Sequence, residues 1–203
     1  MTGFAERQAA VLGAGPRIAA LRPEERSAEQ QDLIERSRPP VHVRHLPGAD
    51  DTEWAEIMAR HPALFEAHMA FAQRFMHDAT LLPRQRELAV LRLAWISGAP
   101  FEWGGHVVIA RACGVADEEI RRVVEGSDAA GWSPLDAALL RAAEELHAES
   151  MIRDTTWADL AISLDERQLI ELVLLVGHYK TVAYYQNALR FRLPAGNDGL
   201  FAR

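Results

Sequence analysis

The chain has 203 residues, of which 49% are hydrophobic and 25% charged, and its formal net charge is −7. This length and composition are typical of one folded domain with a sizeable core, and the acidic balance argues against nucleic acid or an anionic membrane as a partner. Apolar runs such as residues 172–177 are too short to cross a bilayer, and a single cysteine, Cys113, excludes an internal disulfide and a CxxC redox pair.

Residues 1–55 are predicted to be an N-terminal extension with one helix and a proline-containing linker. The run Ser27-Ala28-Glu29-Gln30 matches a capping box, which predicts a helix starting there. Residues 36–48 contain three prolines and are expected to be extended. The start of the chain lacks the pattern of a secretory signal, so a cytoplasmic location is expected.

Residues 56–193 are predicted to form the main domain, which is helical throughout. A helix is expected over residues 62–78, with one stripe formed by Leu64, His68, Phe71 and Phe75. Pro83 opens the next helix, because its missing N–H is harmless in a first turn, and Gly98 with Pro100 ends it. The buried face of that helix is predicted to carry Leu88, Leu91 and Trp95.

Further helices complete an all-α orthogonal or bundle-like array. The helix that carries Glu102 is expected to end at Gly114, and a short helix spans residues 117–125. Another begins at Ser133-Pro134, and a capping box at residues 163–166 begins a long one. Residues 194–203 are predicted to be a loose tail or an arm that contacts a partner.

The run Pro100-Phe101-Glu102-Trp103-Gly104-Gly105-His106 carries the best indication of chemistry. A spacing of four places Glu102 and His106 on one helical face, which Ile109 and Cys113 continue as an apolar side. A carboxylate buried beside an imidazole is costly unless paired, and such groups have shifted pKa values. The adjacent glycines predict close approach of a ligand or of another helix. The alternative is a helix that starts only after Gly105, which weakens the same-face argument.

Residues 60–125 resemble the carboxymuconolactone decarboxylase / alkylhydroperoxidase D-like family. The resemblance is carried by Arg60-His61-Pro62-Ala63-Leu64, by Leu82-Pro83-Arg84-Gln85-Arg86-Glu87-Leu88, by Glu102-Trp103-Gly104-Gly105-His106, and by Ala110-Arg111-Ala112-Cys113-Gly114 with Glu118-Glu119-Ile120. Weaker support comes from Val176-Gly177-His178-Tyr179. The resemblance implies an all-α fold and homo-oligomers, commonly trimers or hexamers.

The resemblance favours the decarboxylase branch of that family. In the peroxidase branch a CxxC pair precedes the histidine, and those two positions fall here at Ala99 and Glu102. The histidine and the upstream glutamate positions are kept, as His106 and Glu87, but both thiols are missing. Thiol-dependent peroxide reduction therefore lacks its nucleophile. The decarboxylase branch has the same acid-Trp-x-x-His arrangement.

We therefore expect cofactor-independent decarboxylation, or a related proton-transfer lyase or isomerase reaction, on a small carboxylated lactone or β-keto-like acid. His106 is predicted to deliver the proton. Glu102 is predicted to orient His106 or to act as the acid itself, and Glu87 to orient the imidazole of His106. Arg86 is predicted to hold the substrate carboxylate, with Trp103 and His178 also in contact with substrate. No cofactor and no metal are expected.

Each of these residues also has a structural interpretation. Glu102 could stabilise the N-terminus of its helix, and Glu87 could form a salt bridge with Arg84 or Arg86. His106 and His178 could be core histidines whose ring nitrogens are hydrogen-bonded. Arg86 also suits a surface or an interface. A metal site is disfavoured because only two ligand-like groups pair, and a serine hydrolase because no G-x-S-x-G run exists. A non-catalytic binding or assembly protein, and a peroxidase-family enzyme with an unusual reductant, remain alternatives.

Overall fold

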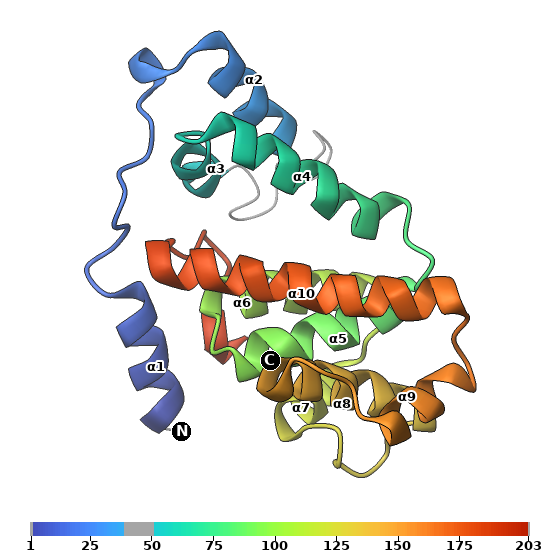
Figure 1. The fold of residues 1–203 in the computed structure, drawn as a ribbon. Coiled ribbons are helices and arrows are strands. Elements are labelled where there is room, and N and C mark those ends of the chain that lie inside the picture. The colour runs from blue at the N-terminus through green and yellow to red at the C-terminus, as the bar shows by residue number, and fades with distance from the viewer. Residues whose placement is uncertain (1, 39–50, 203) are drawn as a thin grey trace.

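The computed structural model describes residues 2–38 and 51–202, which form α-helices and short 3-10 turns without any strand (Figure 1). The α-helices are α1 (Thr2–Leu12), α2 (Ala28–Ser37), α3 (Glu53–Met58), α4 (Pro62–His77), α5 (Pro83–Ile96), α6 (Pro100–Ala112), α7 (Asp117–Glu125), α8 (Pro134–Glu149), α9 (Asp154–Ala161) and α10 (Glu166–Leu189). The 3-10 turns are η1 (Pro23–Glu25) and η3 (Gly199–Phe201). The predicted all-α fold is confirmed. No helix in these residues is both long and apolar enough to cross a membrane.

Helix α5 is the central element of the fold. It packs against α6, α7, α8 and α10, while α2, α3 and α4 form a further layer beyond α10 (Figure 1). One face of α5, with Ala89 and Leu93, joins the core shared with α8 and α10, and another, with Leu88 and Leu91, joins the core shared with α6. A helix buried on several sides has little room for charge. Glu87, in the first turns of α5, is fully buried and therefore needs partners of opposite charge.

Local signals placed most helix starts correctly. Proline stands at the first helical position of α4, α5, α6 and α8. The capping box at α2 is present, since the Gln30 amide donates to Ser27 Oγ (3.2 Å) and the Ser27 amide donates to Gln30 Oε1 (2.9 Å). For α10 the cap lies two residues later than predicted. Asp165 is the N-cap there, because Gln168 rather than Glu166 completes the reciprocal pair.

Among its described residues, the N-terminal extension holds the whole of α1 and α2 and the start of α3, where one helix was predicted. The sequence did not reveal α1 because its capping signals are weak and its anchors are distant. Arg7 donates to the carbonyls of Gly98 (3.2 Å) and Ser97 (3.1 Å), and Gln8 Oε1 accepts from the Leu200 amide (2.7 Å). Helix α9 was missed as well. The predicted linker at residues 36–48 is helical at its first two residues, and positions 39–48 lie outside the described residues.

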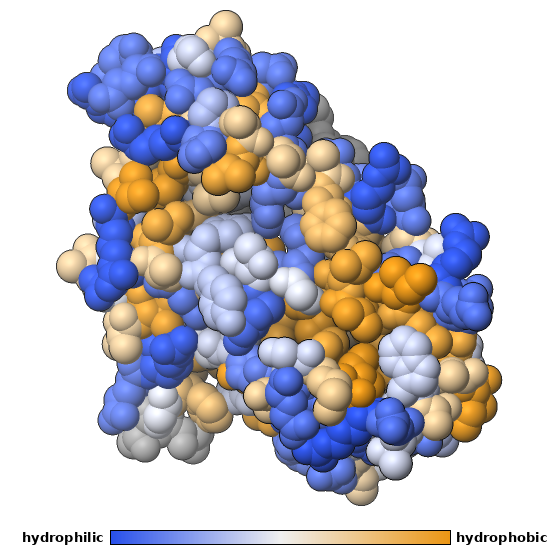
Figure 2. Space-filling view, viewed as in Figure 1, coloured by the Kyte–Doolittle hydropathy of each residue, from blue (hydrophilic) through white to orange (hydrophobic). Residues whose placement is uncertain are grey.

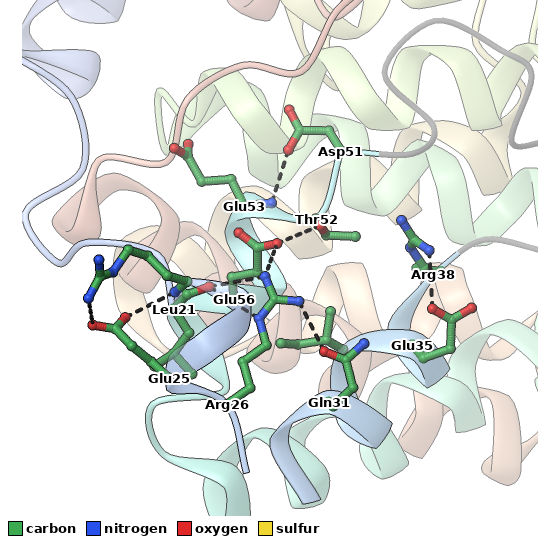
Figure 3. Close-up of polar contacts among 12 residues, drawn as sticks. Leu21, Glu25, Arg26, Gln31, Glu35, Arg38, Asp51, Thr52, Glu53 and Glu56 are labelled. Atoms are coloured by element: carbon green, nitrogen blue, oxygen red, sulfur yellow. Dashed lines mark hydrogen bonds and ion pairs between the residues drawn. The ribbon is translucent and has the colours of Figure 1, made fainter. Parts of the chain in front are cut away.

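A buried ion pair joins the chain before α2 to α3 (Figure 3). Arg26 Nη2 donates to Glu56 Oε1 at 2.8 Å, and the two side chains are 11% and 18% exposed. Arg26 also donates to the Leu21 carbonyl and to Gln31, while the Thr52 hydroxyl donates to Glu56. Because both charges are shielded from water and bonded to several partners, this contact fixes the layer of α2, α3 and α4.

The apolar stripe predicted on α4 is only partly buried. Phe75 is buried, but Leu64 is 61% and Phe71 is 41% exposed. Helix α4 packs mainly against α2 and α10, and the part of its apolar face that carries Leu64 and Phe71 stays exposed. Figure 2 shows further hydrophobic residues over the N-terminal half of α10, where Ile170 and Leu174 are exposed.

The C-terminal segment is not a loose tail over the described residues. Leu200 is 1% exposed, and the Trp103 indole Nε1 donates to the Ala202 carbonyl at 3.0 Å. A Cβ atom on Gly104 would collide with the Asn197 side chain, so the close approach predicted at this glycine is made by the chain's own C-terminal segment. The sequence-based prediction was wrong because Pro194 and Gly196, which follow the end of α10, do not prevent the chain from folding back.

We expect Trp103→Phe to lower the free energy of unfolding by about 1–3 kcal/mol, because the buried Ala202 carbonyl loses its donor. Urea titration measures this loss, and limited proteolysis should release the C-terminal segment sooner. Trp157→Phe is the matched control, since Trp157 is 43% exposed. Equal losses in the two variants would mean that the indole bond does not hold the segment.

Candidate active site

Glu87 of α5 and His106 of α6 meet where these two helices cross. His106 Nδ1 lies 2.7 Å from Glu87 Oε2, and the carboxylate fixes this ring nitrogen as the donor. Glu87 is fully buried, and the His106 side chain is 12% exposed. The structure therefore brings together the histidine and the glutamate predicted to orient it. The remaining ring nitrogen, Nε2, points away from Glu87 toward Glu102.

Arg86 is buried behind Glu87, and its guanidinium group is already bonded to the protein. Its Nε donates to Glu87 Oε1 (2.7 Å), Nη1 donates to the Phe75 carbonyl (3.1 Å), and Nη2 lies 3.8 Å from Cys113 Sγ. The residue is 4% exposed. Its predicted role in holding a substrate carboxylate finds no support from this position. Arg86 instead neutralises Glu87, as the salt-bridge interpretation proposed.

Glu102 lies on the other side of the imidazole and is buried without a partner. Helix α6 runs without a break from Pro100, so the alternative start after Gly105 is wrong and the same-face prediction holds. Glu102 Oε1 is 4.0 Å from His106 Nε2, which is too long for a hydrogen bond. Among the described residues, neither Glu102 oxygen has a hydrogen-bond partner, and the residue is 3% exposed.

The three groups titrate in a linked way. Burial raises the pKa of Glu102 to about 8, with the charge of His106 opposing and that of Glu87 adding to the shift. Burial alone lowers the pKa of His106, but the bonded Glu87 carboxylate outweighs it and the pKa is raised. For Glu87, burial opposes ionisation, yet His106 and Arg86 hold its pKa below the usual value. These pKa directions favour an ionised Glu87, a protonated His106 and a neutral Glu102 near neutral pH.

Tyr179 of α10 closes the site and was not among the predicted site residues. Its ring meets the His106 ring edge to face, with centroids 4.9 Å apart. Burial, with the charges of Glu102 and Glu87, raises the pKa of the Tyr179 hydroxyl, so it stays protonated. A signal was available, because Tyr179 ends the run that gave the weaker part of the family resemblance.

His178 occupies an aromatic cluster between α4 and α10, beside the site and not within it. Its ring stacks on His68 (4.8 Å between centroids) and contacts Phe71, Phe75 and Tyr179. Burial, helped by His68, lowers the pKa of His178 to about 4, so the ring is neutral. The structure favours its structural interpretation, and its predicted contact with substrate has no support from this position.

Trp103 faces away from His106. It is fully buried in the core between α5 and α6, with its ring 4.9 Å from that of Trp95. Its predicted contact with substrate finds no support from this position, because one residue of helix turns a side chain by about 100°. Trp103 follows Glu102 directly and therefore cannot share the face of Glu102 and His106.

Cys113 lies closer to the site than its position in the sequence indicated, through its contact with Arg86. Burial and the charge of Glu87 raise the pKa of its thiol, so it is not a reactive thiolate at neutral pH. Among the described residues, no group of three or more His, Cys, Asp or Glu side chains is arranged to hold a metal ion.

Residues 62–145 match the model of the Carboxymuconolactone decarboxylase family. This span contains Glu87, Glu102 and His106, so the resemblance inferred from the sequence is confirmed over these residues. No curated protein matches the chain.

Solved structures confirm the alkylhydroperoxidase D-like helical fold. A variant of the debrominase Bmp8 in complex with 2,3,4-tribromopyrrole has a TM-score of 0.72 at 12% identity, covering 91% of this chain and 95% of its own. An alkylhydroperoxidase AhpD core from Ralstonia eutropha JMP134 also reaches 0.72, at 15% identity, with 91% and 97% covered. A protein of unknown function from Agrobacterium tumefaciens gives 0.62 at 20% identity, with 67% and 94% covered. Identities this low establish the fold alone.

Proposed function

We propose that the protein is a cofactor-independent carboxy-lyase, or a related proton-transfer lyase or isomerase, acting on a small carboxylated lactone or β-keto-like acid. One observation carries the proposal. The Glu102 carboxyl group is buried, uncharged at neutral pH and without a hydrogen-bond partner among the described residues, and it adjoins a charged imidazole. Two proton donors 4.0 Å apart suit a reaction that ends by protonating carbon. The family match over residues 62–145 supports this class of reaction.

The chain's own residues would divide the work as follows. The bond between the substrate and its carboxylate breaks, carbon dioxide leaves, and the electron pair moves through the adjacent carbonyl group to form an enolate. Glu87 occupies His106 Nδ1, so the proton on Nε2 is the one available for transfer. His106 Nε2 or the Glu102 carboxylic acid then protonates carbon, and solvent restores the donor.

The charge balance of the site favours an anionic substrate. Arg86 and His106 each carry a positive charge, Glu87 a negative one, and Glu102 none at neutral pH, which leaves one net positive charge. In a buried site this charge attracts a substrate carboxylate more strongly than it would in water. As carbon dioxide leaves, the negative charge stays on the enolate, where the same groups stabilise it.

The alternative functions predict different observations. A non-catalytic binder of small ligands would show ligand-induced stabilisation without product. A peroxidase-family reaction finds less support, since Cys113 is the only cysteine and its pKa is raised. Assembly into a homo-oligomer and a cytoplasmic location remain part of the proposal, with the exposed apolar residues of α4 and α10 as the available surface.

We expect His106→Ala to lower carbon dioxide release from γ-carboxymuconolactone by at least about 10²-fold, because a positioned proton donor contributes that much. The assay compares the wild type with this variant and with His77→Ala, which removes an exposed histidine at the end of α4. Full activity in His106→Ala would exclude the assigned role. If the wild type itself releases nothing, this substrate is wrong, and thermal shifts with other small carboxylates then separate binding from turnover.

A further inference from the structure

A cationic cavity lies along the C-terminal half of α10, and none of its lining residues belongs to the Glu87–His106 site. A cavity of about 540 Å³ opens between α1, the C-terminal half of α10 and the adjoining ends of α5 and α8. Four of its lining residues are cationic, and none is acidic. The cations are Arg7, Arg17, Lys180 and Arg190. In a chain with a net charge of −7, such a concentration of positive charge is unexpected.

None of these four cations has a carboxylate partner among the described residues, although Lys180 and Arg190 are partly buried. Arg26, Arg84 and Arg92 each pair with an aspartate or a glutamate. Like charges around one cavity repel each other unless an anion lies between them. The cavity therefore contains the charge arrangement of a site that a separate anion would complete.

Lys180 is held in place by neutral groups, which leaves its charge available. Its Nζ lies 2.9 Å from His147 Nδ1 and 3.3 Å from Ser97 Oγ. Burial, with the charges of Lys180 and Arg92, lowers the pKa of His147, so the ring is neutral and accepts a hydrogen bond from the ammonium group. An ammonium group has three N–H donors, and these contacts use two of them.

Backbone contacts fix the position of Arg7 across the cavity. It donates to the carbonyls of Ser97 and Gly98, which are neutral acceptors that do not cancel its charge. The Asn187 amide nitrogen donates to the same Gly98 carbonyl (3.4 Å), while its Oδ1 is buried without a partner among the described residues. A buried acceptor without a donor is costly, and a hydroxyl group of a bound molecule would satisfy it.

An apolar cavity adjoins the cationic one. It measures about 290 Å³ and shares His147, Lys180 and Tyr184 with the first cavity, while Leu93 and Val176 belong to its remaining wall. A molecule seated at Lys180 can therefore place a charged end among the cations and carbon atoms against the apolar wall. This arrangement fits an organic anion better than an inorganic ion.

We propose that this cavity binds a small organic polyanion, such as a polycarboxylate or a phosphate ester. Several cations without partners give such a molecule charge-assisted hydrogen bonds, which are stronger than neutral ones. Because Arg7 belongs to α1 and Lys180 to α10, the bound anion bridges two helices. Binding should therefore also hold α1 in place.

The test measures binding of citrate and pyrophosphate to the full chain by calorimetry and thermal unfolding, against sodium chloride at equal ionic strength. We expect saturable binding of one anion per chain with a raised Tm. Lys180→Gln and Arg17→Gln should each weaken binding roughly tenfold, since each removes one charge-assisted contact. Arg121→Gln is the matched control, because Arg121 is an exposed arginine on α7. Preference for citrate or for pyrophosphate distinguishes carboxylate from phosphate ligands.

Three results would overturn the proposal. The first is a stabilisation that sodium chloride reproduces at equal ionic strength, which indicates general screening. The second is equal weakening in Arg121→Gln. The third is a change in oligomeric state with salt and no anion binding, which would assign the cations to contact with a second copy of the chain.

Discussion

Glu102→Gln should stabilise the protein increasingly as the pH rises, and at the same time reduce its activity. The pKa of Glu102 is about 8 in the folded state, against an ordinary value of 4.5. A raised folded-state pKa means that the protonated group stabilises the fold fully in acid, and that this contribution is lost as the pH rises through about 8. Each pKa unit corresponds to about 1.4 kcal/mol. Glutamine has no proton to lose, so its stability lacks this dependence.

Urea unfolding at several pH values measures the effect. The variant and the wild type should have similar free energies of unfolding near pH 4.5, and the variant should exceed the wild type by a few kcal/mol near pH 8. Glu118→Gln, which changes an exposed glutamate, should show no such divergence. A difference between Glu102→Gln and the wild type that stays constant with pH would mean that Glu102 is not protonated in the folded state.

The activity of the wild type should fall as the pH rises above about 8, because Glu102 then ionises. Loss of activity with gain of stability is the combination that distinguishes a functional group from a structural one. A buried carboxyl group without a partner contributes nothing to the fold that glutamine would not supply. Its cost is understandable only if a substrate supplies the missing contact.

The parts of the fold that could be predicted were those set by nearby residues. Pro83 and Pro100 mark helix starts by their own chemistry, and the spacing of Glu102 and His106 places them on one face at any tertiary arrangement. The structure adds what the spacing could not give, which is that α5 supplies Glu87 to the same imidazole. The family resemblance, rather than periodicity, pointed to that residue.

The errors arose where the orientation of a side chain depends on packing between distant elements. Trp103 and Arg86 lie next to residues that face the site, yet their own partners are Ala202 and Phe75, which no local pattern connects to them. Tyr179 reaches His106 only because α10 crosses α6. Sequence spacing therefore placed Glu102 beside His106, whereas the surroundings of this pair required the assembled helices.

Glu87→Gln should both destabilise the protein and reverse the pKa shift of His106. Glu87 is the carboxylate partner of two buried cations, Arg86 and His106. Removing one partner of a buried ion pair costs about 3–5 kcal/mol, because the other charge stays buried. Without the carboxylate, burial is the dominant influence on His106, so its pKa should fall below the ordinary value.

The sign of the pH dependence follows from the same shift. In the wild type the raised pKa of His106 means that its protonation stabilises the fold in acid, and that this stabilisation is lost as the pH rises through the folded-state pKa. In Glu87→Gln the imidazole should be neutral at neutral pH, and any activity that needs the imidazolium should move to lower pH. NMR titration of the histidine ring protons measures the pKa, and pH–rate profiles measure the consequence.

Glu145→Gln is the control that separates a loss of stability from a loss of the contact between Glu87 and His106. Glu145 is also a buried glutamate, but it bonds to Thr156 and to the Arg153 amide, which are far along the chain from His106. This variant should lose stability and leave the His106 titration unchanged. An unchanged His106 pKa in Glu87→Gln would show that the short contact between the two residues does not set the charge of the imidazole. The role of Glu87 would then be limited to packing, and His106 would keep its raised pKa without it.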